Sequence, residues 1–304
     1  MAETPARSTA PGAGPGATGR EQAEERAALD MVRARARAAL SEAEELLRRV
    51  DPDWSPPPYD ALLVAQALGI RCVRMDTPSA SPHPALLCRS RDRPTILYRE
   101  GADARTRFNL FHEIAHTLFP DFRENPLLSR RRPRLFEPDG RLERLCDAAA
   151  LEFMMPADLF EADLVDNGFG AERVADLCAR YGVWPEEVCL RMIASDLECC
   201  GLARFECAPG PRRRHPLQQE RTLGMRYFVA SASFQDRGLA VLRRLDLDRG
   251  HPLHVAARSK KPATAELLVP LLTGDLHPFL VEALPLPGRR RHGYSPVAGF
   301  FYPR

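Results

Sequence analysis

Two histidines stand four residues apart in the run RTRFNLFHEIAHTLFP, and a glutamate directly follows the first of them. Residues four apart on a helix face the same way, so His112 and His116 can bind one metal ion through their imidazoles. Glu113 lies about 100° around the helix from His112 and can take a proton from a water that the ion activates. This HExxH arrangement predicts the active site of a zinc peptidase.

A catalytic zinc site needs a third protein ligand beside two histidines. The extension HExxHxxGxxH does not supply one, because Phe119 and Phe122 stand where it requires glycine and histidine. The second predicted helix, in LERLCDAAALEFMMP, offers Glu143 and, four residues later, Asp147 on one face. We expect Glu143 to be the third ligand and Asp147 to accept the outer N–H of a ligating histidine. Two acids on one face repel unless a cation or a donor lies between them, which favours this interpretation.

The elements that must position these residues are short and surround the motif. Residues 21–50 carry mixed charge and strong helix formers, which predicts a long amphipathic helix. IRCVRMD, ALLCRS and TILYRE predict three strands, which we expect to form a small antiparallel meander. The histidine helix is expected to begin after Asp103, a good N-cap, and to stop before Pro120.

The pattern of helices, strands and turns predicts an α+β chain with a mostly helical core that contains a small antiparallel sheet, and a small C-terminal α+β domain. The HExxH motif in the core makes that core a zincin-like peptidase by expectation. In that last domain we expect ATAELLVPLL to be a helix and MRYFVASASF, LAVLRRLDL, HPFLVEALP and SPVAGFFYP to be strands. The predicted segments are a disordered tail (1–20), the peptidase core (21–156), a helical, helix-turn-helix-like segment (157–207), a linker (208–218) and the α+β domain, with regulation as one interpretation of its role (219–304).

Overall charge and apolar runs exclude several classes of protein. The net charge is +2, so no global field attracts nucleic acid or an acidic membrane. No stretch approaches the roughly 18 apolar residues that a membrane helix needs. Eight cysteines in mostly apolar contexts, none in a CxxC pair, are typical of reduced thiols. These features predict a soluble, cytoplasmic protein. The basic run at 129–136 is expected to be a solvated loop near the rim of the active site.

The run RFNLFHEIAHTLF followed by ERLCDAAALEFMMP resembles the ImmA/IrrE family of metallopeptidases. The strand TILYRE before the motif and the lead-in YDALLVAQALGIRCVRMD are also similar to family members, so the resemblance covers roughly residues 30–200. By this match His112, His116 and Glu143 are expected to be the metal ligands, and Glu113 the catalytic acid/base.

Three positions depart from the family pattern without removing an expected ligand. Asn109 stands where members have Ser or Thr, and Phe111 and Cys146 stand where they have Ala. The departures therefore concern packing more than chemistry.

The resemblance implies a narrow substrate class and one divalent transition metal. Members of the family cut a helix-turn-helix repressor (XRE-type), which relieves repression of stress genes or mobile elements. Zinc is the favoured ion, and manganese also suits two histidines and a carboxylate. A GAF-like sensor occupies the C-terminus in the IrrE branch, although residues 219–304 are short for one. The alternative is a catalytically inactive transcriptional regulator that keeps the fold, but retention of Glu113 argues against it.

Contacts with substrate are predicted at three places. Tyr98 and Tyr181 are candidates for stabilising the oxyanion, and the strand at Thr95–Arg99 is expected to hold the substrate as an added β-strand. The helical segment is expected to pack on the core or dock substrate. We do not favour direct DNA contact, because 174–192 carries more acidic than basic residues.

Overall fold

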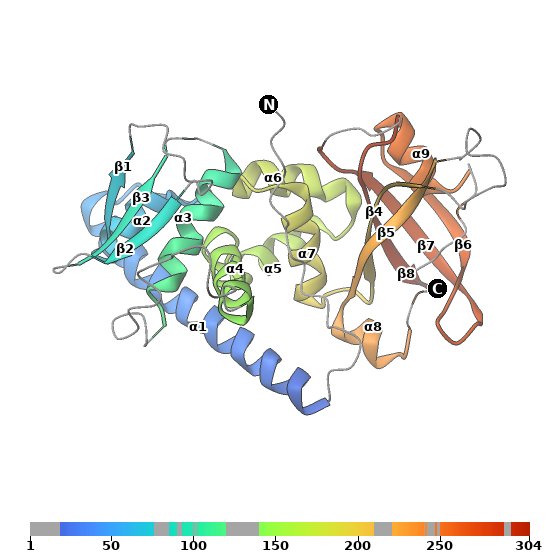
Figure 1. The fold of residues 1–304 in the computed structure, drawn as a ribbon, viewed down its shortest axis with the longest axis horizontal. Helices are drawn as coiled ribbons and strands as arrows, with labels where there is room; N and C mark the ends of the chain where they lie inside the picture. The colour runs from blue at the N-terminus through green and yellow to red at the C-terminus, as the bar shows by residue number, and fades with distance from the viewer. Residues whose placement is uncertain are drawn as a thin grey trace. The chain divides into compact units, whose positions relative to one another are not determined.

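The computed structural model places helices and two sheets along the chain, of three and five strands (Figure 1), which is the α+β class that the sequence predicts. The residues described are 19–75, 85–89, 93–99, 101, 103–119, 140–209, 221–239, 241, 247, 250–288 and 293–304. They fold as two compact units: the first runs to Leu159 and includes 180–183, and the second holds Phe160–Ala179 and Trp184–Arg304.

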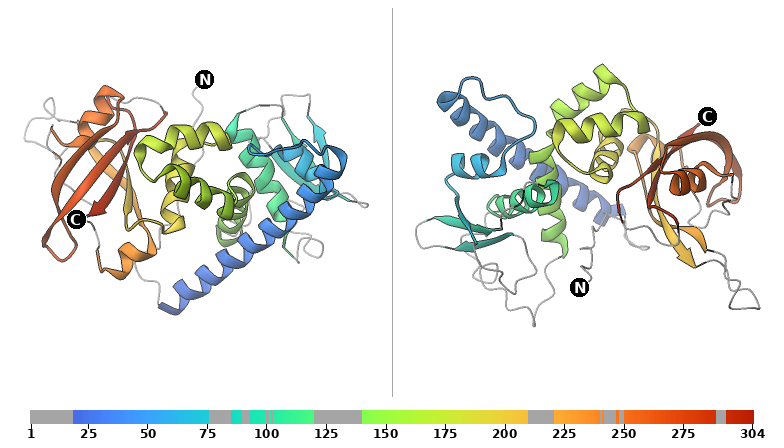
Figure 2. Two further views of the ribbon diagram at one scale, coloured as in Figure 1. Left: turned by 180° about the vertical axis from the view of Figure 1, so that it is seen from behind. Right: turned by 90° about the horizontal axis from the view of Figure 1, so that it is seen from above.

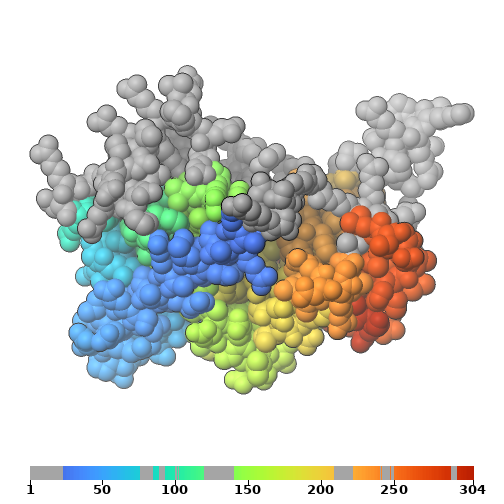
Figure 3. All heavy atoms as spheres, turned by 90° about the horizontal axis from the view of Figure 1, so that it is seen from below, coloured from blue at the N-terminus to red at the C-terminus, as the bar shows by residue number. Residues whose placement is uncertain are grey.

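Four helices build most of the first unit: α1 (Gly19–Val50), α2 (Ala61–Ala67), α3 (Ala104–His116) and α4 (Gly140–Met154). The inward face of α1 carries Val32, Ala36, Leu40 and Ala43, which recur every three or four residues and are all buried. This face packs on α4, while the opposite face forms a ridge on the surface of the unit (Figure 3). The predicted long amphipathic helix is therefore confirmed.

The helices α3 and α4 pack directly against each other. Phe111 of α3 and Phe153 of α4 are fully buried, and their rings stack with centroids 5.4 Å apart. At the end of α4, the buried carboxylate of Glu152 accepts hydrogen bonds from Arg37 (3.2 Å) and from the backbone N–H of Ala157 (2.9 Å). This contact ties α1 and α4 to the start of α5 (Ala157–Asn167).

The start of α3 follows the sequence prediction. Asp103 has extended backbone angles, and its carboxylate accepts a hydrogen bond from Thr106 N at 2.8 Å, as an N-cap residue does. The helix ends at His116, before Pro120. Both histidines of the motif therefore lie on one continuous helix.

The small sheet of the first unit comprises β1 (Arg71–Arg74), β2 (Ala85–Arg89) and β3 (Pro94–Tyr98). Its order is β1-β3-β2, with β2 antiparallel to β3 and β1 parallel to β3. The predicted wholly antiparallel meander is therefore wrong for β1. The placement of β3 in the centre also overturns the prediction that Thr95–Arg99 receives a substrate strand, because hydrogen-bonding partners flank it on both sides.

The second unit is built on a five-stranded antiparallel sheet of order β5-β4-β8-β7-β6. The strands are β4 (Gly201–Pro209), β5 (Arg221–Ala230), β6 (Ala263–Pro270), β7 (Leu276–Pro285) and β8 (Val297–Pro303), and the helices that follow α5 are α6 (Val174–Tyr181), α7 (Pro185–Ser195), α8 (Ala232–Asp236) and α9 (Pro252–Ser259). The sheet curves around α9 (Figure 2), and Leu253, Phe234, Phe279 and Phe301 fill the space between them. This arrangement supplies the second unit with a core of its own.

One helix prediction in this unit is wrong. The segment ATAELLVPLL forms β6, which pairs with β7 along its whole length. Thr264, Glu266 and Leu268 are exposed, and the residues between them are more buried, which is the period of two of a strand. The helix formers Ala, Glu and Leu suggested a helix, but pairing with a neighbouring strand outweighs such weak intrinsic preferences.

The predicted segment boundaries also differ from the compact units. β4 begins at Gly201, inside the segment predicted to be helical (157–207), and α7 packs on β4 and β5, which places it with the sheet. The predicted tail (1–20) and linker (208–218) lie outside the described residues, apart from the start of α1 and the end of β4. Whether the predicted segments act as separate functional domains stays a prediction.

Candidate metal centre

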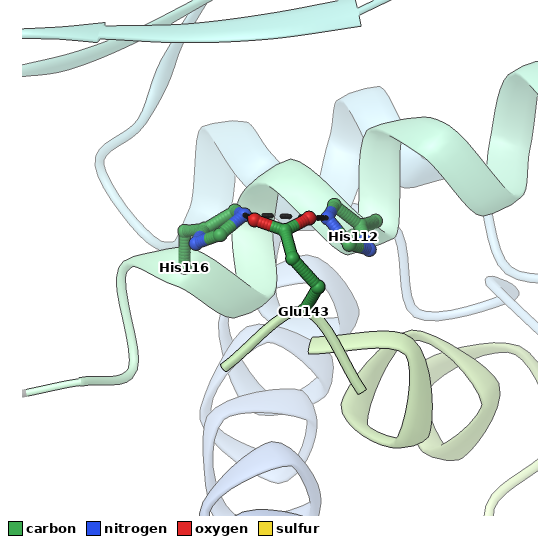
Figure 4. A group of neighbouring side chains, drawn as sticks. All are labelled: His112, His116 and Glu143. Atoms are coloured by element: carbon green, nitrogen blue, oxygen red, sulfur yellow. Dashed lines mark hydrogen bonds and ion pairs between the residues drawn. The ribbon is translucent and has the colours of Figure 1, made fainter. Parts of the chain in front are cut away.

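Three potential ligand atoms converge where α3 meets the first turn of α4 (Figure 4). The Nε2 atoms of His112 and His116 are 3.2 Å apart. The Glu143 carboxylate lies between the two rings, with Oε2 3.3 Å from His112 Nε2 and Oε1 3.9 Å from His116 Nε2. All three ligand atoms lie within 4.8 Å of one another. We call these three residues the candidate metal centre.

Local geometry and packing together explain this convergence. The four-residue spacing places both imidazoles on one face of α3. The stacked pair Phe111–Phe153 fixes α4 against α3, so that Glu143 in the first turn of α4 meets the histidines. The side chains of the candidate metal centre are 14%, 11% and 28% exposed, which leaves the carboxylate side open to a ligand.

The outer nitrogen of His112 has the partner that the sequence predicts. His112 Nδ1 lies 2.8 Å from Asp147 Oδ1, and Asp147 is on the same face of α4 as Glu143. When Nδ1–H donates to Asp147, the neutral imidazole directs the Nε2 lone pair at the Glu143 carboxylate. Two electron-rich atoms 3.3 Å apart require a cation or a proton between them.

The negative charge of the carboxylates around the candidate metal centre favours a cation. Burial lowers the pKa of His112, but its hydrogen bonds to Asp147 and Glu143 and the charge of Glu113 outweigh burial and raise that pKa to about 9. The same carboxylates that attract a proton attract a metal ion. Two imidazoles and one carboxylate are a ligand set that divalent transition metals accept, so the residues present fit such an ion.

Glu113 lies beside the candidate metal centre but is not one of its converging ligands. Its Oε2 accepts a hydrogen bond from the backbone N–H of Leu87 at 2.8 Å. Leu87 belongs to β2, an edge strand of the small sheet. Sequence reasoning missed this contact, because it joins a strand and a helix that are 26 residues apart. It orients the carboxylate that the motif assigns to acid/base chemistry.

A second contact that sequence reasoning missed anchors α3. The guanidinium of Arg107 donates hydrogen bonds to the backbone oxygens of Tyr181 (3.1 Å) and Gly182. Gly182 has φ = 59°, and a Cβ there would lie 2.2 Å from the guanidinium. Glycine is favoured at this position because the backbone is left-handed, and the absent Cβ also leaves room for the guanidinium. The contact fixes the N-terminal half of the helix that carries the histidines.

The two tyrosines predicted as oxyanion candidates lie in different settings. Tyr181 is 1% exposed and interacts electrostatically with Tyr59, whose hydroxyl bonds to Glu44 of α1. Its burial is incompatible with contact to a substrate. Tyr98 is half-buried at the end of β3, opposite Ala85 and Arg74, and its role stays a prediction.

A histidine, histidine and glutamate group on two packed helices beside a small sheet defines a metallopeptidase-type domain. Comparison with known families agrees: residues 65–192 match the family model of the IrrE N-terminal-like domain, a peptidase family. The chain therefore contains a domain of this peptidase family over residues 65–192. The match includes every residue of the candidate metal centre as well as Glu113 and Asp147.

A Mycobacterium tuberculosis transcriptional regulator has a similar fold. The TM-score is 0.50 at 12% sequence identity, over 92% of this chain and 81% of that chain. At this identity the similarity concerns the fold alone. No curated protein matches the sequence. Among the described residues, no helix is long and apolar enough to cross a membrane.

Proposed function

We propose that this protein is a metal-dependent endopeptidase that cleaves a helix-turn-helix transcriptional repressor and thereby relieves repression. The observation that carries the proposal is the convergence of His112, His116 and Glu143 within 4.8 Å, with Glu113 beside them. A purely structural helix pair gains nothing from three buried or half-buried acceptors that face one another. The peptidase family to which the domain belongs supports the same reaction class.

The residues have distinct tasks in this mechanism. His112, His116 and Glu143 hold the ion, and Asp147 fixes the His112 ring so that Nε2 faces inward. When bound, a divalent ion supplies Lewis-acid chemistry at the scissile carbonyl and at the attacking water. Zinc is the favoured ion, and manganese also fits the ligand set.

Glu113 moves the proton. Its Oε2 accepts a hydrogen bond from Leu87 N–H, which orients the carboxylate that accepts a proton from the attacking water. The same carboxyl group then donates the proton to the leaving amide nitrogen, and the peptide bond breaks. Because Leu87 lies on the edge strand β2, an extended substrate segment added to β2 would run beside Glu113.

The repressor substrate is proposed from the family resemblance. In this proposal the protein acts in the cytoplasm, and its partner is the repressor protein and not a membrane or DNA. The second unit is then a docking or regulatory part of the peptidase.

A second candidate function is a regulator without peptidase activity. The similar fold of a protein titled a transcriptional regulator favours this alternative. The two functions differ in their need for Glu113, because binding alone needs the fold and not the acid/base. A proteolytic readout therefore separates them.

The test compares wild type with Glu113→Gln in cells. Newly formed protein N-termini are sequenced by mass spectrometry after each form is expressed. The proposal expects new N-termini within helix-turn-helix proteins with wild type and none with Glu113→Gln. Equal relief of repression by both forms, without new N-termini, would establish the regulator instead. Glu45→Gln is the matched control, because Glu45 is 68% exposed on α1 and distant in sequence from the site.

A further inference from the structure

The two histidines of the candidate metal centre differ in the partners of their outer nitrogens. His112 Nδ1 meets the Asp147 carboxylate at 2.8 Å, whereas His116 Nδ1 meets the thiol sulfur of Cys146 at 3.4 Å. Glu143, Cys146 and Asp147 are spaced i, i+3 and i+4, so one face of α4 presents all three groups to α3. One helix face thus supplies the carboxylate that faces both Nε2 atoms and a contact for the Nδ1 atom of each histidine.

The Cys146 contact is fully enclosed. Cys146 is 0% exposed, and His116 as a whole residue is 9% exposed. The surrounding part of the α3–α4 interface is apolar, with Ile114, Ala115 and Ala149 also fully buried. A polar ring nitrogen in such a place needs a partner, because an unsatisfied buried donor is costly.

The position of the sulfur defines its role. The Nε2 atom of His116 faces the other two ligands, and Nδ1 lies on the opposite side of the same ring. Cys146 therefore sits outside the ligand set. For Nε2 to offer its lone pair to an ion, Nδ1 must carry the proton, and the sulfur lies 3.4 Å away as an acceptor for it.

We infer that Cys146 is a positioning residue for His116, whose Nδ1–H it accepts so that Nε2 points at the ion. The inference rests on the proposed metal binding and adds a residue that the HExxH motif does not include. A thiol is a weaker acceptor than a carboxylate. Its removal should therefore weaken metal binding less than removal of the Asp147 carboxylate.

The alternative is that Cys146 is only a small apolar side chain that fills the interface. The two roles differ in how they respond to serine and alanine. Serine keeps an acceptor at this position, and alanine removes it. If packing alone matters, serine is the worse replacement, because it buries a hydroxyl group in an apolar interface.

The test is a Co²⁺ titration of the full-length, metal-free protein, followed through the visible absorption of the bound ion. We expect Cys146→Ala to weaken Co²⁺ binding about fivefold to tenfold and Cys146→Ser to stay within about twofold of wild type. The visible spectrum should change with Cys146→Ala, because the His116 ring is no longer held. Cys189→Ala is the matched control, since Cys189 is equally buried but lies on α7 in the second unit.

Each contrary outcome has a defined meaning. The positioning role would be overturned, and the metal site would stand, if the Cys146→Ala variant bound Co²⁺ within twofold of wild type. The same conclusion would follow if the Cys146→Ser variant bound Co²⁺ more weakly than the Cys146→Ala variant. A sulfur-to-cobalt charge-transfer band in wild type would overturn it too, because the thiol would then be a ligand. No Co²⁺ or Zn²⁺ binding by folded wild type would overturn both this role and the proposed function. Thermal melting of each metal-free variant shows whether folding is intact.

Discussion

The candidate metal centre in the first unit and a polar cluster in the second unit use similar residues in opposite ways. In the second cluster, Glu186 of α7 accepts a hydrogen bond from Tyr227 at 2.8 Å and is paired with Arg204. We call these three residues the Glu186 cluster. Arg204 also donates to Glu206 at 2.8 Å. Acid, base and hydroxyl are paired with one another there, so the charges of the cluster are matched without a ligand.

The candidate metal centre becomes complementary only when a proton or a metal ion joins its groups. Its two imidazole Nε2 atoms and one carboxylate all point at a common space, and each is an acceptor when the imidazoles are neutral. Acceptors that converge disfavour the folded state unless a cation joins them, whereas matched pairs stabilise it. The comparison indicates that complementarity separates a structural cluster from a binding site, while burial alone does not.

The largest expected effect is on catalysis. Glu113→Gln should lower the rate of peptide cleavage by about 10²–10⁴-fold, because the amide cannot accept a proton from water. Metal content should be unchanged, because Glu113 is not one of the converging ligands. Cleavage of a peptide substrate, measured together with elemental analysis, checks both points. Residual cleavage near the wild-type rate would remove Glu113 from the mechanism.

Glu143→Ala should have the next largest effect. It removes the carboxylate from the ligand set, so metal affinity should fall by about 100-fold or more. Elemental analysis of purified wild type should find about one transition metal per chain, and the variant should lose most of it. Glu45→Ala serves as the control for loss of one acidic charge. Equal metal in both variants would mean that Glu143 is not a ligand.

Asp147→Asn tests the outer contact of His112. The amide keeps the size of the side chain but removes its charge, so metal affinity should fall by about 10–100-fold. The effect should exceed that of Cys146→Ala, because a carboxylate is the stronger acceptor. Zinc titration of the metal-free protein gives both values. A reversed order would show that the outer contact of His116 dominates.

The Glu186 cluster should respond in stability and not in metal binding. Glu186→Ala leaves Arg204 and Tyr227 without their shared acceptor, so unfolding should require about 2 kcal/mol less free energy. Urea denaturation monitored by circular dichroism measures this loss. The metal affinity of the variant should equal that of wild type. A drop in metal affinity would contradict the separation of the two clusters.

The smallest expected effect concerns Glu187, beside the Glu186 cluster. Burial raises the pKa of Glu187 to about 7 from the usual 4.5, so the native state keeps a proton that the unfolded chain releases. The contribution of Glu187 to stability therefore falls as pH rises from about 5 to 7. Glu187→Gln should be more stable than wild type by about 1–2 kcal/mol at pH 8 and equal to it at pH 4. Denaturation at both pH values tests this, and an equal difference at both would contradict it.

Sequence reasoning performed best where geometry is local. The spacing of His112 and His116 and the N-cap at Asp103 depend on residues within one or two helical turns, so helix periodicity predicts them. Glu143 and Asp147 follow the same rule on α4, and the predicted hydrogen bond from His112 to Asp147 is present. The chemical roles of these residues stay predictions that the variants above address.

Sequence reasoning failed where pairing is non-local. β6 has the composition of a helix and becomes a strand because β7 lies beside it. The strand at Thr95–Arg99 was expected to receive substrate, but β1 and β2 flank β3. Strand order depends on contacts between segments that are distant in sequence, and the secondary-structure propensities of single residues contain no information about such contacts.

Local sequence is enough to predict the helix that carries both histidines, the second helix with its acids, and the class of chemistry that these residue types allow. Tertiary packing is needed to bring α4 onto α3 so that Glu143 meets both imidazoles, to place Leu87 N–H on Glu113, and to bring Cys146 to His116. The physical reason is the distance along the sequence over which each interaction acts. Helix periodicity acts over a few residues, whereas these contacts depend on how buried side chains such as Phe111 and Phe153 fit together.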